Sequence, residues 1–327
     1  MPAILIVIIA IALIFDFLNG FHDASNIVAT MISSRAMSPR KALALTAAAE
    51  LAGPFLFGVA VATTIGSEVA DPAALSSAVI IAALLGAIAW NLITWYFGWP
   101  SSTSHALIGG LMGSVIVAQG LDPVRWGGVE KVLIALLVSP LLGFVIGFLV
   151  LRIIYFLARG ATPGINTLFK RAQLGTSLAL ALSHGTNDAQ KTMGIIAMAM
   201  VTTGYTEQFH VPWWVIAISA GAIALGTATG GWRLIETLGA KFFKIRPVHA
   251  FGSQLTSAGI ILGAALLGGP VSTTQVVSSA IMGSGSADRV SKVRWTVARD
   301  IAIAWILTIP VTSIIAAGLY LLVSLVV

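Results

Sequence analysis

The chain has 327 residues, of which 57% are apolar and only 9% are charged, and it contains no cysteine. A soluble domain carries about 25% charged residues, so this composition, with a mean hydropathy of +0.97, excludes a soluble globular protein, and the lack of cysteine excludes disulfides and thiolate metal sites. The formal net charge of +6 comes from basic loops, which membrane orientation explains, and we expect no nucleic-acid partner.

Apolar segments of membrane-spanning length follow one another along the chain. A helix needs about 20 apolar residues to cross the hydrocarbon core of a bilayer. The first half contains a series of such segments, at 3–33, 41–66, 74–97 and 129–157, with a shorter one at 100–118. A similar series starts at about residue 172. The pattern predicts an all-α polytopic membrane protein surrounded by the lipid bilayer.

The first segment contains a polar interruption that occurs again in the second half. Residues 20–26 read GFHDASN and residues 185–191 read GTNDAQK, each after an apolar run. A glycine beside a carboxylate and amides predicts a broken helix at both places. An ionisable residue inside a membrane segment indicates a functional site. We therefore expect Asp23 and Asp188 to hold a cation or carry a proton, with a helix cap or a brace for the break as the structural alternative.

Loop charges predict the orientation of the segments. The positive-inside rule assigns basic loops to the cytoplasm, and four loops contain most of the basic residues: Arg35, Arg40, Lys41; Arg152, Arg159, Lys170, Arg171; Lys241, Lys244, Arg246; and Arg289, Lys292, Arg294, Arg299. The other connections are acidic or balanced, as at Glu68, Asp71 and Glu207. The resulting path is that of a multi-pass protein of the inner (cytoplasmic) membrane with both termini outside.

The two halves share further sequence features at a similar spacing. Gly20 and Gly185 are 165 residues apart, Gly53 and Gly226 are 173 apart, and Pro100 and Pro270 are 170 apart. The path above gives the halves opposite orientations. Inverted-topology repeats with interrupted helices are typical of secondary transporters, whose sites lie near the bilayer midplane. We predict an N-terminal repeat at 1–158, a short basic cytoplasmic linker at 159–171 and a C-terminal inverted repeat at 172–327.

A second pair of motifs is rich in hydroxyl groups. Residues 98–105 read GWPSSTSH and residues 268–275 read GGPVSTTQ, each between apolar runs. Proline suits the first position of a helix and Ser or Thr caps it, so we expect two re-entrant half-helices. A helix N-terminus binds anions through unpaired N–H groups and its partial positive charge. The candidate ligands of a tetrahedral oxyanion are Ser101, Ser102, Thr103, Ser104, Ser272, Thr273 and Thr274.

Other polar residues flank the two acidic motifs. Lys191 lies three residues after Asp188, within reach on one helical face, and we expect it to neutralise that carboxylate, with direct anion contact as the alternative. Asn26 and Asn187 provide amide groups for the bound ions, or else bond to the nearby backbone. Glu50 and Asp16 are expected to face the interior.

Three histidines also lie beside the motifs. His22, His105 and His184 form a proton relay or, alternatively, pack between helices with their hydrogen bonds satisfied. Their spacing matches no zinc motif, and we expect no metal site and no cofactor other than the coupling ion, H⁺ or Na⁺.

The motifs together resemble those of one transporter family. GFHDASN followed by VAT, SHGTNDAQKTMG and GWPSSTSHALIGG are similar to segments of the inorganic phosphate transporter (PiT) family, in particular to compact bacterial low-affinity phosphate permeases. The resemblance covers about residues 10–300. It implies an inverted-repeat carrier of orthophosphate driven by a proton or sodium gradient, with both termini outside. Val271 replaces the first hydroxyl of the second cluster, so we expect that cluster to be poorer in donors.

The resemblance also implies roles for single residues. Asp23, Asn26, Asn187 and Asp188 belong to the substrate and cation region, and the Ser/Thr clusters belong to the phosphate cradle. We therefore predict a symporter that imports inorganic phosphate by alternating access, and not an enzyme.

Several alternatives stay open at the level of sequence. A channel would share the polar half-helices, and a hydrolase would use Ser102, His105 and Asp23. The sequence does not decide whether the substrate is phosphate, sulfate or arsenate. It also does not decide whether transport is coupled to H⁺, to Na⁺ or to a neutral metal–phosphate complex. It also leaves the oligomeric state open, with a homodimer as one alternative.

Overall fold

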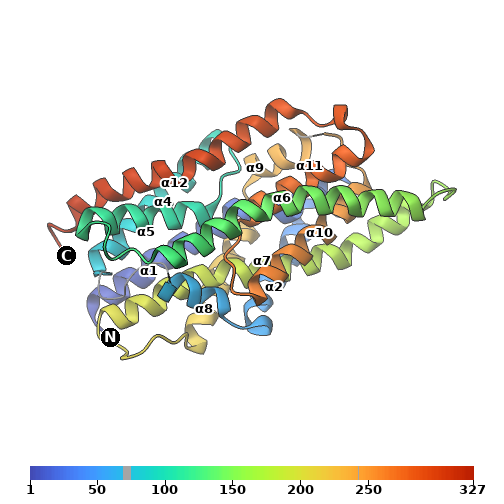
Figure 1. Cartoon of the computed structure of the whole chain (residues 1–327). Coiled ribbons are helices and arrows are strands. Elements are labelled where there is room, and N and C mark those ends of the chain that lie inside the picture. The colour runs from blue at the N-terminus through green and yellow to red at the C-terminus, as the bar shows by residue number, and fades with distance from the viewer. Residues whose placement is uncertain (69–74, 242) are drawn as a thin grey trace.

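The computed structural model describes residues 1–68, 75–241 and 243–327, and these residues form helices and no strands (Figure 1). The side chains of Glu68 and Lys241, and the whole of Asp71, lie outside the described part. The helices are α1 (Ala3–Ser33), α2 (Pro39–Phe57), α3 (Ala60–Thr63), α4 (Ser77–Phe97), α5 (Thr103–Gln119), α6 (Trp126–Leu157), α7 (Ile165–Thr202), α8 (Trp213–Thr229), α9 (Trp232–Glu236), α10 (Pro247–Leu266), α11 (Thr273–Asp288) and α12 (Trp295–Val323).

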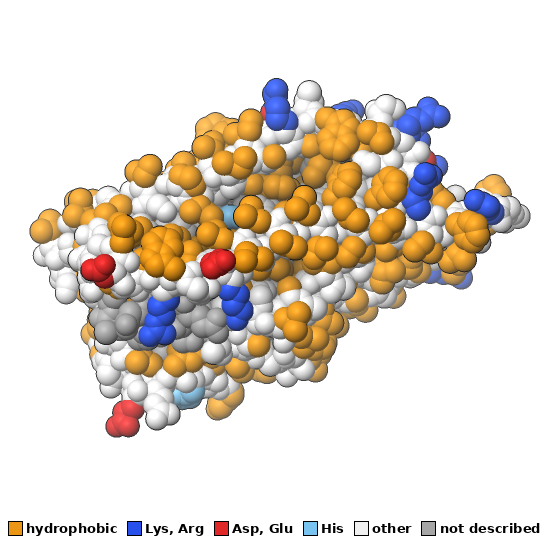
Figure 2. All heavy atoms as spheres, viewed as in Figure 1, with side chains coloured by type: hydrophobic (Ala, Val, Ile, Leu, Met, Phe, Trp, Pro, Cys, Tyr) orange, Lys and Arg blue, Asp and Glu red, His pale blue; other side chains and the backbone are white. Residues whose placement is uncertain are grey.

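Four of these helices are long and apolar enough to cross a membrane by themselves. They are α1, α4, α6 and α12. Helices α6 and α12 turn large apolar side chains outward, for example Leu137, Ile306 and Ile314, which are 67%, 74% and 72% exposed. Apolar side chains cover much of the visible surface (Figure 2). Because water would oppose this exposure and lipid favours it, the prediction of an all-α polytopic membrane protein is confirmed.

Helices α1 and α7 run unbroken through the two acidic motifs, so our prediction of helix breaks at residues 20–26 and 185–191 is wrong. Helix α1 has 31 residues and α7 has 38. Gly20 and Gly185 instead mark places where another helix backbone comes very close. The carbonyl oxygen of Ile223 in α8 would meet a side chain at Gly20, and that of Glu50 in α2 would meet one at Gly185. Glycine is thus required for close packing, and not for a break.

The breaks lie in the helices that cross α1 and α7. Helices α2 and α3 are bent by 76° at Gly58 and Val59, and α8 and α9 by 65° at Gly230 and Gly231. Broken helices are therefore present, as predicted, but at other positions.

The first bend is braced by Gln190 from α7. Its amide nitrogen donates to the carbonyl oxygen of Gly58 at 2.8 Å, and its amide oxygen accepts from the N–H groups of Val61 at 2.8 Å and Ala62 at 3.2 Å. In the membrane an unpaired backbone group costs several kcal/mol, so one side chain stabilises an otherwise unfavourable turn.

Helices α5 and α11 begin at the hydroxyl clusters, as expected. The Oγ atoms of Ser102 and Ser272 cap them by accepting from the N–H groups of His105 at 3.1 Å and Gln275 at 3.3 Å. Pro100 and Pro270 lie two residues before these caps, so our placement of proline at the first helical position is wrong. The helices have 17 and 16 residues, which is short for a span.

The chain ends and the basic residues lie at opposite ends of the molecule. Both termini are at one end in Figure 1, and Lys and Arg side chains gather toward the other end in Figure 2. We call the latter the basic end. Helix α7 begins there at Ile165, so it includes the second half of the predicted linker 159–171. Which end faces the cytoplasm, and the boundaries of the predicted repeats, stay predictions.

Packing contacts occur in matched pairs across the two halves. Gly53 in α2 meets Leu182 and Thr186 of α7, and Gly226 in α8 meets Phe17 and Phe21 of α1. The spacings in these pairs are those that the sequence motifs show. Glycines 173 residues apart thus bring α2 and α8 into backbone contact with α7 and α1, while the duplication itself stays a prediction.

We predict that Gly226→Ala destabilises the protein. A methyl group there would overlap the carbonyl oxygen of Phe17 and the N–H of Phe21, and such overpacking costs about 1–3 kcal/mol. The apparent melting temperature of the detergent-solubilised protein measures the effect. Gly221→Ala on the same helix is the matched control, because nothing lies within 4 Å of the added methyl group. Equal melting temperatures for the two variants would contradict this account of α1–α8 packing.

Candidate ion-binding site between α1, α7 and α11

The two acidic residues predicted from the sequence meet in the structure. The Thr273 hydroxyl at the start of α11 lies 3.1 Å from Asp23 Oδ2 and 3.3 Å from Asp188 Oδ2, within hydrogen-bond reach of both. Asp23 comes from α1 and Asp188 from α7, and both are 0% exposed. One hydroxyl therefore joins the two carboxylates that lie at equivalent positions of the two motifs.

His184 lies between the same carboxylates. Its Nε2 atom is 3.7 Å from Asp23 Oδ2 and 3.7 Å from Asp188 Oδ2. One ligand atom from each of these three residues falls within 4.8 Å of the others. The arrangement is compact enough to hold one small cation or to pass a proton between the acids.

Glu50 of α2 extends this cluster on the far side of His184. Glu50 Oε1 lies 2.8 Å from His184 Nδ1, so the carboxylate and the imidazole form a buried pair. Glu50 is completely buried, so it faces the interior, as expected.

Lys191 pairs with Asp188 as expected. Its Nζ atom lies 2.7 Å from Asp188 Oδ1, and the lysine is 0% exposed. A buried charge requires a partner of opposite sign. Because this one ammonium group belongs to Asp188, Asp23 has no lysine or arginine partner among the described residues.

Helix α11 contributes a second hydroxyl to Asp23. Thr274 Oγ1 donates to Asp23 Oδ1 at 3.0 Å and accepts from Asn26 Nδ2 at 3.1 Å. We expected the second Ser/Thr cluster to be poorer in donors because of Val271. Even so, this cluster makes the direct contacts with the carboxylates through Thr273 and Thr274.

Helix α5 reaches the site through a chain of polar groups. Ser101 Oγ lies 2.8 Å from Thr94 Oγ1, which lies 3.5 Å from His22 Nε2. His22 Nδ1 in turn lies 2.9 Å from Asp23 Oδ1. The two half-helix tips also touch each other, since Ser104 Oγ donates to the carbonyl oxygen of Val271 at 3.1 Å.

Both half-helices direct free N–H groups at this region. Within the described residues, the backbone N–H groups of Thr103, Ser104, Thr273 and Thr274 have no hydrogen-bond acceptor. Such orphan donors, with the positive end of the helix dipole, bind anions. The site therefore offers donors for an anion beside carboxylates for a cation.

Two buried amide oxygens beside the site accept no hydrogen bond in the described structure. They are Asn26 Oδ1 and Asn187 Oδ1. Asn187 uses its amide nitrogen to donate to the carbonyl oxygen of Gly269 at 3.2 Å, just before α11. Since unsatisfied polar groups are expensive in a membrane, these atoms indicate that the site receives polar guests.

Three further residues have structural roles that the sequence motifs do not predict. His184 lies between the two carboxylates, Thr94 links α5 to His22, and Gln190 braces the first bend. His184 lies four residues before Asp188, which places both on one helical face, and this spacing was the available signal. Thr94 and Gln190 act through partners distant in sequence, which no local pattern shows.

Comparison with known proteins identifies related sequences over nearly the whole chain. The model of the phosphate transporter family matches residues 19–163 and 158–316. A probable low-affinity inorganic phosphate transporter of Bacillus subtilis (strain 168) is 44% identical over 98% of this chain and 97% of its own length. A protein of Rhizobium meliloti (strain 1021) with the same description is 43% identical over 99% of this chain and 97% of its own length.

A solved structure has the same fold. It is described as the sodium-dependent phosphate transporter, and it superposes with a TM-score of 0.89 at 25% identity, covering 100% of both chains.

We predict that Thr273→Val destabilises the protein and Thr273→Ser does not. Valine keeps the volume but leaves the two carboxylates without their shared donor, and interhelical hydrogen bonds in membranes contribute about 0.5–2 kcal/mol. Thermal unfolding in detergent measures the difference. A valine variant as stable as the serine variant would show that the hydroxyl does not join α1, α7 and α11.

We also predict that Lys191→Met is strongly destabilising, because it leaves Asp188 buried without its counter-charge. Removing one partner of a buried ion pair costs about 3–5 kcal/mol. The double variant Lys191→Met/Asp188→Asn removes both charges and should recover most of the loss in the yield of folded protein. No recovery would mean that Lys191 acts mainly through another contact.

Proposed function

Because the chain belongs to the phosphate transporter family and is a membrane transporter and not an enzyme, we propose that it is a cation-coupled symporter that imports phosphate by alternating access. The observation that carries this proposal is the contact of Thr273 with Asp23 and Asp188. It puts the N-terminus of a half-helix, which suits an anion, directly against two carboxylates, which suit a cation.

Charge balance explains why the two kinds of ligand belong together. Phosphate carries between one and two negative charges at neutral pH. Each elementary charge moved inward against 100 mV, inside negative, costs about 2.3 kcal/mol. A cation bound in the same enclosed site offsets the charge of the anion, so the loaded carrier crosses the field at lower cost.

The ligand atoms favour sodium as the coupling ion. Asp23, Asp188 and Thr273 provide three oxygens near one point, and hard cations prefer oxygen ligands. The structural neighbour is described as sodium-dependent, which supports the same choice. The proton is the second candidate, because His184 lies within 3.7 Å of both carboxylates and histidine exchanges protons near neutral pH.

The phosphate ion is assigned to the space beside the two helix starts. Its oxygens would accept from the free N–H groups of α5 and α11 and from the hydroxyls of the Ser/Thr clusters. Asn26 and Asn187 lie next to this space with unpartnered amide oxygens, which accept hydrogen bonds and so suit a cation or a protonated phosphate.

Alternating access requires that the site be closed from one side at a time. In the described conformation Asp23, Asp188, Asn26, Asn187 and Lys191 are all 0% exposed, so the site is enclosed. The bends at Gly58 and Gly230 separate α3 from α2, which packs against α7, and α9 from α8, which packs against α1. We assign the opening motion to these bends, with α1 and α7 as the fixed frame.

We predict that Asp23→Asn and Asp188→Asn abolish accumulation of phosphate. The amide keeps the shape but removes the charge that binds the cation, so the gradient no longer drives uptake. Uptake of radiolabelled phosphate into proteoliposomes, under an imposed sodium gradient or pH gradient, measures this and distinguishes the two coupling ions.

Glu207→Gln is the matched control, because Glu207 is an exposed acid in a loop and its loss should leave uptake unchanged. Wild-type accumulation in either aspartate variant would refute the assigned role. Passage of phosphate without accumulation in the wild-type protein would indicate a channel.

A further inference from the structure

A large cavity at the basic end is lined by basic side chains from distant parts of the chain. It has a volume of about 740 Å³ and is bordered by Arg35, Lys170, Lys244, Arg246 and Arg294. These residues come from the α1–α2 loop, the start of α7, the α9–α10 loop and the α11–α12 loop. Among the residues that the structure describes, none of those that line it is acidic. We call it the basic cavity.

Most of this positive charge is not neutralised within the protein. Arg246 pairs with Asp288 at 2.7 Å. For Arg35, Lys170, Lys244 and Arg294, the described part of the chain contains no carboxylate oxygen within 4.0 Å. Membrane orientation accounts for the sign of these charges, but not for their convergence on one hollow. Four unpaired cations around a cavity favour a small anion with several negative oxygens.

Arg35 holds its place at the cost of backbone strain. It is the one described residue other than glycine with a positive φ, at 56°. The N–H of Arg35 donates to the carbonyl oxygen of Ile32, and the N–H of Ala36 donates to the carbonyl oxygen of Met31. These two hydrogen bonds close the end of α1. Glycine is the usual residue at this position of a helix end. An arginine kept in a conformation that favours glycine indicates a use for its side chain.

A line of polar side chains leads from the ion site to this cavity. Asp23, Asn26 and Thr30 on α1 and its C-cap residue Ser34 follow one another at spacings of three and four residues, which places them on one face. Over these 11 residues the helix rises about 16 Å. Ser34 lines the basic cavity, so one end of the line is Asp23 and the other is the cavity wall.

Hydrogen bonds with α7 and α10 close this line in the described conformation. Gln254 Nε2 donates to Thr30 Oγ1 at 2.9 Å, and Thr176 Oγ1 donates to Gln254 Oε1 at 2.7 Å. Ser34 Oγ donates to Gln173 Oε1 at 2.8 Å. A hydrated ion can replace these polar contacts between helices with hydrogen bonds of its own, whereas it could not do so for apolar contacts. The arrangement therefore suits a closed passage.

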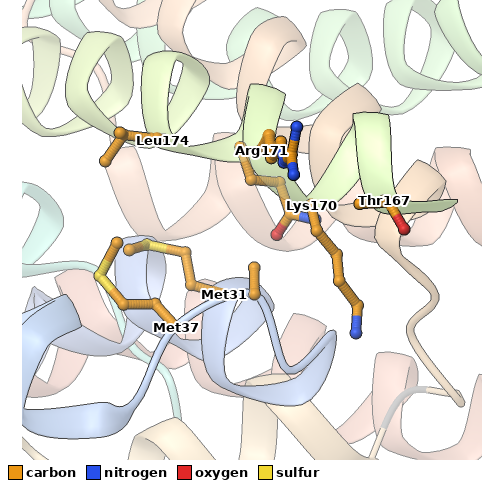
Figure 3. Close-up of a pocket in the computed structure, with 8 residues that line it drawn as sticks. Met31, Met37, Thr167, Lys170, Arg171 and Leu174 are labelled. Carbon is orange, nitrogen blue, oxygen red and sulfur yellow. The ribbon is translucent and has the colours of Figure 1, made fainter.

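From these observations we infer that the basic cavity is a second anion site, which holds inorganic phosphate at the inner mouth of the passage. The inference rests on the proposed function only for the identity of the ion. A smaller cavity of about 270 Å³ (Figure 3) shares Lys170 with the basic cavity. Its walls include Arg171 but also the apolar side chains of Met31, Met37 and Leu174, so fewer basic groups converge on it.

Titration of the purified protein with inorganic phosphate tests the inference. The protein is placed in phosphatidylcholine nanodiscs, and calorimetry is repeated from 0.01 to 0.15 M choline chloride, over which the Debye length falls from about 30 to 8 Å. We expect two binding components. The enclosed site should change little with salt, and the basic cavity should weaken, because its charges face solvent.

The variant Arg35→Gly/Arg294→Gln should weaken only the salt-sensitive component, by about 2- to 30-fold, since exposed ion pairs contribute about 0.2–1 kcal/mol each. Glycine also relaxes the backbone at position 35, so misfolding would not explain the loss. The control Arg40→Gln/Lys41→Gln removes two exposed basic side chains of the same end that do not line the cavity. Equal effects of both double variants, or a single salt-insensitive component in the wild type, would overturn the inference.

Two further arms separate the remaining explanations. In Asp23→Asn the salt-sensitive component should persist, so its presence is read independently of the proposed coupling mechanism. In nanodiscs of phosphatidylglycerol it should also persist. Its loss there would assign the cavity to a lipid headgroup phosphate and would overturn free phosphate as the ligand.

Discussion

The structure depends on keeping carboxylates inside a membrane. Asp23 and Asp188 lie where no water from bulk solvent reaches them, and an isolated charge there is costly. Lys191 neutralises the charge of Asp188, and the hydroxyls of Thr273 and Thr274 at the start of α11 donate hydrogen bonds to Asp23. The other features follow from this requirement: α11 must begin beside the two carboxylates, and α1 and α7 must pass close enough together to share Thr273.

The helix packing follows from the same requirement. Glycines at matched positions let α8 and α2 cross α1 and α7 in backbone contact. The crossing helices then break, and at one break Gln190 pairs the freed backbone groups. Unbroken α1 and α7 carry the two aspartates, and in the function that we propose the bends between α2 and α3 and between α8 and α9 allow the movement that opens the site.

The sequence predicted the membrane class, the half-helix starts and the group of residues that meets at the site. These signals are local: hydropathy, a capping serine, and an acid inside an apolar run. The predictions failed where the role of a residue depends on a partner that is distant in sequence. The glycine of GFHDASN looks like a helix breaker, and only the position of Ile223 shows that it serves packing. His184 likewise gains its significance from Asp23, which lies 161 residues earlier.

In the mechanism that we propose, cation and phosphate bind in one enclosed site and stabilise each other there. Calorimetric titration of the purified protein with phosphate, at a salt concentration high enough to suppress weak exposed sites, tests this most directly when it is done with and without the coupling cation. Typical coupling between sites changes affinity about 5- to 150-fold, and the effect is reciprocal. We predict that phosphate affinity rises by at least about fivefold with sodium, or with decreasing pH if the proton is coupled, and that phosphate raises cation affinity by the same factor. Phosphate affinity that is independent of both ions would contradict the account.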